Sequence, residues 1–456
     1  MNHHYNSPKM VKLVGYSVLV ALFLQLSHST PVQPVVRYHG PEQIHISYTG
    51  NLSSMFVTWT TVVFFGEGSV TFKLSSSDWM TANATVTTVD HYDSDNSDLH
   101  RTSYVFRATM EPLKPDTVYE YYVSNGILNS GKFSFRTFPP NENYKPKIAV
   151  FGDLGLKNHV ALDKLEQEGQ KRKYDVIWHI GDFAYDLHEL MGARGDAFMN
   201  LIQPIAARYA YSVIPGNHET KNNFSEYRNR FTSPPPNVFF HSYNIGPIHL
   251  VMFNTEFYYN SQFGTAQIQT QYNWLVEDLK TANLQANREN QPWIIAVGHR
   301  PMYCSSQHYG DCRPDNLIRT GYQNKYYNLE NLFFQQGVDL QIYGHMHNYE
   351  RMYPIYNFTF EKVPDPSLYD DPKYPVHFVS GSAGNREIHP GFWYPEPRWS
   401  FFRSNDYGFA YIEVVGRLEL KISQYSVPKA RNIDEFTIKK SGSYPKFIEQ
   451  EIIQNM

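Results

Sequence analysis

The sequence predicts an all-β sandwich domain followed by a larger α/β domain. Short runs of alternating apolar and polar residues, separated by turn residues, occupy positions 34–140, and this period of two is typical of strands in a sandwich. Beyond a proline-rich boundary, apolar runs alternate with stretches of helical period, as expected for a sheet covered by helices. The 456 residues are enough for two such domains and too many for one core.

The first domain is expected to contain seven short strands. Val57 and Trp59 alternate as a buried pair would. The stretch 113–123, around Tyr119, resembles the tyrosine corner of fibronectin type III domains. Such a module, or a generic sandwich without a binding role, is mainly a scaffold. The expected strands are residues 44–48, 55–60, 69–74, 85–89, 103–110, 118–123 and 132–137.

The second domain is placed at residues 145–440, after Pro139 and Pro140. Its carboxyl-terminal part, 375–427, contains the runs 376–379 and 410–415, which we expect to complete the second sheet. The tail 441–456 has little periodicity and is expected to be peripheral. One helix with a buried face is predicted from apolar residues at helical spacing, namely Ile268, Tyr272, Leu275 and Leu279.

Composition and charge exclude several classes of protein. With 41% hydrophobic and 18% charged residues, the chain is not a disordered one. The 40 basic and 44 acidic residues give a formal charge of -4, so no broad basic surface is available for nucleic acid. The 19 histidines would add positive charge only in an acidic compartment.

The amino-terminal segment 1–29 is typical of a secretory signal peptide. Its apolar run 13–26 follows two lysines and precedes small residues, and it is shorter than the roughly 20 apolar residues that span a membrane. A retained anchor is the alternative. We therefore expect cleavage near Ser29, no stable membrane span, and a secreted or lysosomal protein.

Two further features fit an oxidising, secretory route. Cys304 and Cys312 are the only cysteines, so a local disulfide is the default, and two cysteines alone make no zinc site. Four N-x-Ser/Thr sequons without an intervening proline are candidate glycosylation sites, and they begin at Asn51, Asn83, Asn223 and Asn357.

Five strand-like runs in the second domain end in a glycine that is followed directly by a residue able to bind a metal. Because ligands of α/β sheets bind beyond the carboxyl ends of the strands, the five tips can meet in one crevice. Glycine permits the sharp turn and the close backbone approach that this requires. Tyr185 and His347 lie near enough in sequence to join them. The five pairs are Gly152-Asp153, Gly181-Asp182, Gly216-Asn217, Gly298-His299 and Gly344-His345.

The seven donors exceed what one ion needs. A single Gly-Asp pair is ordinarily a turn, and a single histidine is ordinarily a hydrogen-bonded imidazole, but these interpretations must then hold at five places together. Three carboxylate or phenol groups, three imidazoles and one carboxamide suit two ions. The pattern therefore predicts a two-metal site.

These blocks resemble, in the same order, the five metal-ligand blocks of purple acid phosphatases, which belong to the calcineurin-like metallophosphoesterase superfamily. The resemblance covers residues 34–427, because two-domain members of that family also carry a fibronectin-like domain. It implies a catalytic domain of two mixed β-sheets flanked by helices. By this resemblance the metal ligands are Asp153, Tyr185 and His347 for the first ion, Asn217, His299 and His345 for the second, and Asp182 as the bridge.

Ligand charge supports that division. Asp153, Tyr185 and a share of Asp182 give the first ion an anionic, hard set that suits Fe³⁺. Two imidazoles and an amide suit a divalent second ion, Zn²⁺, Fe²⁺ or Mn²⁺. Tyr185 discriminates the family, because related two-metal phosphoesterases usually lack a tyrosine at this place.

Two histidines are candidate catalytic residues. By the resemblance, His218, next to Asn217, assists the leaving group, and the alternative is a hydrogen bond beside the site. His308 matches the first of two adjacent histidines in plant members, while Tyr309 occupies the second position. Glu350 and Arg351 are expected to be structural supports without a chemical role.

The sequence thus predicts an acid phosphatase that hydrolyses phosphate monoesters by attack of metal-bound hydroxide at a binuclear Fe(III)-M(II) centre. Its partners are small-molecule phosphate monoesters, with phosphoproteins as a further candidate class. A phosphodiesterase on the same metal frame is one alternative. A catalytically dead extracellular binding protein is the other, and the full ligand set argues against it.

Overall fold

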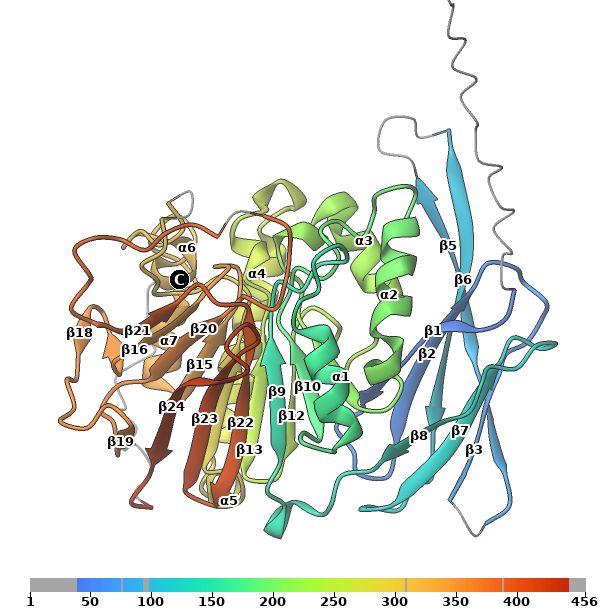
Figure 1. Cartoon of the computed structure of the whole chain (residues 1–456), viewed down its shortest axis with the longest axis horizontal. Coiled ribbons are helices and arrows are strands. Elements are labelled where there is room, and N and C mark those ends of the chain that lie inside the picture. The colour runs from blue at the N-terminus through green and yellow to red at the C-terminus, as the bar shows by residue number, and fades with distance from the viewer. Residues whose placement is uncertain (1–38, 75–76, 93–97, 308–309, 388, 443–456) are drawn as a thin grey trace, which may run out of the picture. The chain divides into compact units, whose positions relative to one another are not determined.

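A computed structural model describes residues 39–442, apart from 75–76, 93–97, 308–309 and 388 (Figure 1). The predicted signal peptide at 1–29 and the residues 443–456 of the tail lie outside the described residues. No helix of the described part is long and apolar enough to cross a membrane. The domain boundaries at 140 and 145 stay a prediction.

The amino-terminal part is a sandwich of two four-stranded sheets. Val57 and Trp59 are buried in its core, where Trp59 stacks on Phe106 at a centroid distance of 5.4 Å. The Tyr119 hydroxyl accepts a hydrogen bond of 2.9 Å from the Lys114 N–H, as in a tyrosine corner. In spatial order the sheets are β1 (Glu42–Tyr48), β2 (Met55–Thr61), β6 (His100–Met110) and β5 (Thr85–Tyr92), and β4 (Met80–Asn83), β3 (Ser69–Leu74), β7 (Val118–Ser124) and β8 (Phe133–Arg136).

The seven strands expected from the sequence are all present, and the sandwich has one strand more than expected. The additional strand is β4, which pairs antiparallel with β3 from Ser69 opposite Asn83. It contains four residues, including an alanine and an asparagine, which are poor strand formers. Its place is therefore set by pairing with β3 and not by its own pattern.

The carboxyl-terminal part contains two mixed sheets, as predicted, and each has seven strands. The first sheet has the order β11 (Ala210–Val213), β10 (Val176–His179), β9 (Lys147–Phe151), β22 (Gly408–Gly416), β23 (Glu419–Ser426), β24 (Arg431–Lys439) and β19 (Leu368–Asp370). The second has the order β12 (His241–Ile245), β13 (Ile248–Met252), β14 (Trp293–Val297), β15 (Leu340–Tyr343), β20 (Val376–Ser380), β16 (Tyr349–Met352) and β21 (Ser400–Ser404). A small hairpin is formed by β17 (Ile355–Tyr356) and β18 (Thr359–Phe360).

Apolar side chains fill the space between the two sheets, and a second apolar cluster joins the sheets to the helices. In the predicted helix, Ile268, Leu275 and Leu279 are buried, whereas Tyr272 is only half-buried and Gln271 takes the buried place beside it. The Gln271 amide is satisfied there by the backbone of Asn254. The helices are α1 (Leu162–Gln170), α2 (Ala193–Ala206), α3 (Lys221–Arg230), α4 (Ala266–Ala282), α5 (Gln285–Asn290), α6 (Leu317–Thr320) and α7 (Leu329–Gln335).

One strand assignment was wrong. The runs 376–379 and 410–415 were both expected in the second sheet, but only the former, in β20, lies there. The latter belongs to β22, which pairs antiparallel with β9 of the first sheet. Ala410, Ile412 and Val414 are buried on the face that fills the space between the sheets. The apolar alternation predicted the strand correctly, but it is the same in either sheet.

The sandwich is tied to the carboxyl-terminal part by buried polar contacts. His91 of β5 lies 2.7 Å from a carboxylate oxygen of Glu226 in α3. Arg230 of the same helix pairs with both Glu226 and Asp196. The Tyr121 hydroxyl donates to the Ala207 carbonyl over 2.7 Å. These contacts are consistent with a scaffold that is packed against α2 and α3.

Candidate metal centre

The five predicted strand tips are all strand ends in the structure. β9, β10 and β11 are parallel neighbours in the first sheet, and β14 and β15 are parallel neighbours in the second. Parallel strands end at one edge, so the residues that follow them meet there. Asp153, Asp182, Tyr185 and His345 all have positive φ, between 51° and 66°. Such backbone is costly in non-glycine residues and concentrates at functional sites.

Close packing explains two of the glycines. A Cβ on Gly216 would lie 2.2 Å from the Asp182 carboxylate, and a Cβ on Gly181 would lie 2.5 Å from His299 Nδ1. Gly216 has an ordinary φ of -107°, so the absence of a side chain, and not an unusual backbone angle, is what the site requires there. The glycine before the donor therefore makes room for donors from other strands.

Asp153, Tyr185 and His347 form one contacting group. The Tyr185 hydroxyl donates to Asp153 Oδ1 over 3.2 Å and lies 3.0 Å from His347 Nε2. Asp153 Oδ2 accepts the His345 N–H at 2.8 Å. All of these side chains are buried. This group contains the three side chains assigned from the sequence to the first ion.

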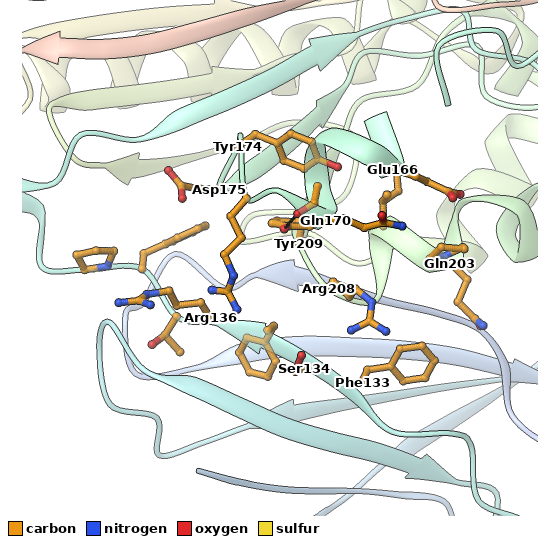
Figure 2. A pocket seen from close by; sticks show the side chains of 18 of the residues that line it. Phe133, Ser134, Arg136, Glu166, Gln170, Tyr174, Asp175, Gln203, Arg208 and Tyr209 are labelled. Atoms are coloured by element: carbon orange, nitrogen blue, oxygen red, sulfur yellow. Dashed lines mark hydrogen bonds between the residues drawn. The ribbon is translucent and has the colours of Figure 1, made fainter. Parts of the chain in front are cut away.

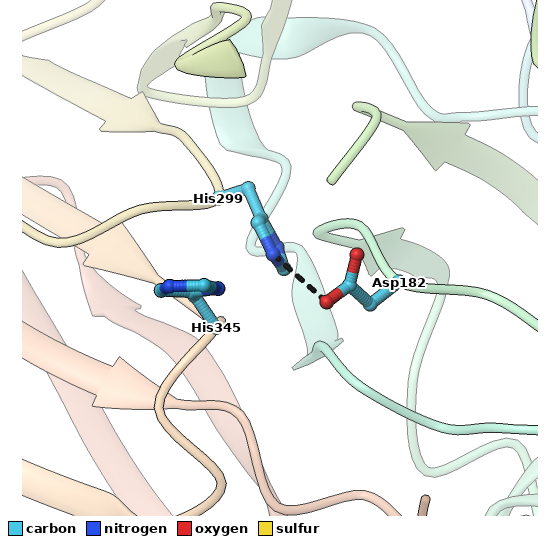
Figure 3. A group of neighbouring side chains, drawn as sticks. All are labelled: Asp182, His299 and His345. Atoms are coloured by element: carbon cyan, nitrogen blue, oxygen red, sulfur yellow. Dashed lines mark ion pairs between the residues drawn. The ribbon is translucent and has the colours of Figure 1, made fainter. Parts of the chain in front are cut away.

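Asp182, His299 and His345 form the second group, in which one ligand atom from each residue lies within 4.8 Å of the others (Figure 3). His299 Nε2 lies 3.1 Å from Asp182 Oδ2 and 3.2 Å from Asn217 Oδ1. His299 Nδ1–H donates to the Ile180 carbonyl over 2.8 Å, which leaves Nε2 as the ligand nitrogen. Carboxylate, amide oxygen and imidazole here fit a metal ion chemically.

The electrostatics of the group favour a cation. Burial opposes ionisation of Asp182, but His299 and His218 hold its pKa well below its usual value. Burial lowers the pKa of His299, but the Asp182 charge more than offsets this and raises it to about 10. A proton is therefore held at His299 beside Asp182. Because a metal ligand must be deprotonated, metal binding would displace this proton.

His218 lies at the edge of the two groups. Its Nδ1 is 2.9 Å from Asp186 Oδ1, its Nε2 is 3.5 Å from Glu387 Oε1, and its ring centroid is 4.4 Å from that of Tyr185. The ring retains 18% exposure, so it is partly accessible to solvent. Its position beside Tyr185 is compatible with the role expected from the sequence.

The other predicted residues divide into those that the structure places and those that it does not describe. His308 and Tyr309 lie outside the described residues. Cys304 and Cys312 are joined in a disulfide, as predicted. Of the sequons, Asn51, Asn83 and Asn357 are exposed, and Asn223 is half-buried.

Glu350 and Arg351, the expected structural supports, make their contacts away from the metal groups. Glu350 accepts hydrogen bonds from the Ser305 N–H and from the hydroxyls of Ser305 and Ser400. It thereby holds the segment that follows His299. Arg351 binds Asp434 through two nitrogens and so links the two sheets.

Sequence reasoning missed several residues that hold the donors in place. Glu219 is buried and accepts the N–H groups of Asp182, Phe183 and Gly216 at 2.9 to 3.0 Å. It lies within the Gly-Asn-His-Glu block, so its position next to the ligands was a signal that was available. Asp186 and Arg300 directly follow the donors Tyr185 and His299, so they too had a local signal. Asp311 and Glu387 had none, because they come from other segments.

Comparison with known proteins gives the family. Three family models match in order: the purple acid phosphatase N-terminal domain at residues 41–137, the calcineurin-like phosphoesterase at 146–349, and the iron/zinc purple acid phosphatase-like protein C at 374–435. Acid phosphatase type 7 of Homo sapiens is 41% identical over 420 residues, which cover 91% of this chain and 94% of that protein. The chain belongs to the purple acid phosphatase family.

More distant members agree with this assignment. Probable purple acid phosphatase 20 of Arabidopsis thaliana is 29% identical over 88% of this chain and 87% of its own. The structure of the purple acid phosphatase PPD1 from yellow lupin (Lupinus luteus) seeds superposes with a TM-score of 0.75 at 22% identity, over 89% of this chain and 75% of that one, which shows the same fold. The predicted enzyme class, an acid phosphatase, is confirmed, and the diesterase and binding-protein alternatives are not favoured.

Proposed function

We propose that this acid phosphatase hydrolyses phosphate monoesters at two metal ions held by seven side chains. Asp153, Tyr185 and His347 would hold the first ion, and Asp182 would be shared. Asn217, His299 and His345 would hold the second. The observation that carries the proposal is that five strand ends from two sheets bring the donor side chains into two contacting groups.

The donor types support a different ion at each position. Asp153 and Tyr185 are anionic when they bind a metal, and with a share of Asp182 they suit Fe³⁺. The second position has neutral donors beside Asp182 and suits Zn²⁺, Fe²⁺ or Mn²⁺. When bound, the ions supply Lewis acidity and an activated water for attack on phosphorus.

The chain itself supplies the proton for the leaving group. Burial disfavours the charged form of His218, but Asp182 and Asp186 raise its pKa to about 12, so the ring is protonated at acid pH. Asp186 orients the ring through Nδ1, which leaves Nε2–H to donate to the departing alkoxide. Asp186 beside Nδ1 and Glu387 beside Nε2 still stabilise the protonated ring when the charge of Asp182 is shared with metal ions.

A secreted or lysosomal location is proposed with this activity. The signal-like segment 1–29, the disulfide and the exposed sequons at Asn51, Asn83 and Asn357 support it. Small phosphate monoesters are the proposed substrates, and phosphoproteins are a further class to test.

Metal analysis of single variants tests the ligand assignment. Asp182→Ala should lower the content of both metals, since a shared carboxylate holds both, whereas Asn217→Ala should chiefly deplete the second. Asp186→Asn is the matched control, because Asp186 contacts His218 and is not a proposed ligand. Retention of both metals by the Asp182 variant would exclude the bridge.

A further inference from the structure

A cavity of about 620 Å³ lies between the sandwich and the phosphoesterase part. One wall is β8 with the three residues after it, and the other consists of the ends of α1 and α2 with the turn at 172–175. Figure 2 shows Arg208 reaching from the end of α2 toward Ser134 and Phe133. This volume is in the range of small-molecule sites.

The cavity is separate from the metal centre. Tyr174 and Asp175, which line it, precede β10. Asp182 follows the other end of the same strand. A ligand in the cavity would therefore lie at the opposite end of the strands from the reacting phosphate. The inference does not depend on the metal ligands proposed above.

Three guanidinium groups line the cavity, those of Arg136, Arg172 and Arg208. Arg136 pairs with Asp116 at 2.8 Å. The side chains of Arg172 and Arg208 make no ion pair or hydrogen bond with the residues that the structure describes. Two carboxylates also line the cavity, those of Glu166 and Asp175, and Asp175 accepts the Lys147 N–H at 2.9 Å.

Aromatic rings also line the cavity. The Arg208 guanidinium lies 5.8 Å from the centre of the Phe133 ring. The ring centroids of Tyr174 and Tyr209 are 4.7 Å apart. The Tyr174 hydroxyl donates to the Leu165 carbonyl, and the Tyr209 hydroxyl donates to the Gly169 carbonyl. The tyrosines thus offer the cavity ring surface and not a free hydroxyl.

Arg172, Arg208 and Tyr209 all line the cavity. Burial raises the pKa of the Tyr209 phenol; the charges of Arg172 and Arg208 oppose that rise, and the charge of Asp175 adds to it. A guanidinium can bind an anion through two N–H groups and can also stack on a flat ring.

We propose that this cavity binds a small aromatic anion, a flat ring that bears a sulfonate, phosphate or carboxylate group. Arg172 and Arg208 bind the anionic group. Phe133, Tyr174 and Tyr209 contact the ring. Because β8 belongs to the sandwich and α1 and α2 to the phosphoesterase part, such a ligand contacts both.

Calorimetric titration of the holoenzyme with 2-naphthalenesulfonate tests the proposal. The wild type should bind one equivalent saturably. Arg172→Gln/Arg208→Gln should bind at least tenfold more weakly, because both charge-assisted contacts are lost. Arg417→Gln/Arg431→Gln is the matched control, since it removes two exposed arginines outside the cavity. Turnover of a phosphate monoester should be unchanged in both double variants.

Two comparison probes separate the parts of the site. Sulfate alone and neutral 2-naphthalenemethanol should each bind at least tenfold more weakly than the sulfonate. The proposal is overturned if the Arg172/Arg208 variant binds the sulfonate as tightly as the wild type, which would place the probe elsewhere. It is also overturned if sulfate alone binds equally well, which would indicate an adventitious ion only.

Discussion

At His218, neighbouring carboxylates give the two ring nitrogens different roles. Asp186 at 2.9 Å fixes Nδ1 as the internal donor, so Nε2 is the atom that can face a substrate. Glu387, at 3.5 Å from Nε2, is 43% exposed and can give way to a leaving group. The catalytic role proposed for His218 therefore depends on both acids.

Replacing His218 should affect substrates according to their leaving group. An alkyl alkoxide needs the proton in the transition state, where a positioned acid supplies about 10²- to 10⁴-fold, whereas an activated aryl oxide departs with less help. His218→Asn should thus slow alkyl phosphates much more than aryl phosphates, with metal content unchanged. Steady-state rates on such a pair measure this, with His249→Asn as a distant control. Equal losses on both substrates would reduce His218 to a positioning residue.

The donor residues could be predicted from the sequence, whereas most of their partners could not. Asp153, Asp182 and His345 each follow a strand and a glycine, and this local pattern can be recognised in the sequence itself. Glu387 reaches His218 from a loop 169 positions further along the chain, as 387 minus 218 shows. Only the folding of two sheets against each other creates that contact, so no spacing rule indicates it.

At the scale of elements, metal binding depends on how closely the strand ends approach one another. Gly216 tests this, because its backbone angle would accept alanine while its Cβ would lie 2.2 Å from Asp182. Gly216→Ala should displace the Asp182 carboxylate, lower the content of both metals and cost about 1–3 kcal/mol of folding stability through overpacking.

The control for this substitution is Gly131→Ala, where a Cβ meets nothing within 4 Å. Metal content and thermal unfolding of the two variants can be compared directly. Full metal content in Gly216→Ala would show that the strand ends have more room than the structure gives them.

Strands with a clear alternation of apolar and polar residues were predicted correctly, whereas the sheet to which such a strand belongs was not always predicted correctly. The alternation in 410–415 indicates a strand with one buried face, which β22 has. The same alternation suits either sheet, and the pairing with β9 is decided by the packing between the sheets. The short β4 lacks such a pattern, and its pairing with β3 alone defines it.

At the scale of the whole molecule, buried histidines limit stability at acid pH. Burial lowers the pKa of His241 and of His377 from 6.5 to about 3 each. Below pH 6.5 the unfolded chain binds protons that the folded chain excludes, so stability is complete above pH 6.5 and falls as the pH drops toward 3. Each histidine should cost about 2 kcal/mol at pH 5.

Thermal unfolding at pH 7.5 and pH 5.0 checks this effect, with the metal supply held constant. His241→Gln and His377→Gln should each show a smaller fall in the unfolding midpoint between the two pH values than the wild type, whatever their midpoint at pH 7.5. The exposed His100 supplies the control His100→Gln. An unchanged fall in both buried variants would show that other groups govern the acid sensitivity.

The most direct test of the two-metal account is the visible spectrum of the purified protein together with its metal content. Burial raises the pKa of Tyr185 well above its ordinary value, so its phenolate forms only when a metal ion replaces the proton. The oxidised wild type should contain two metals per chain, one of them iron, and should absorb in the visible through iron-phenolate charge transfer. Tyr185→Phe should lose that absorption. A colourless, oxidised wild type with both metals bound would contradict the assignment of Tyr185 to Fe³⁺.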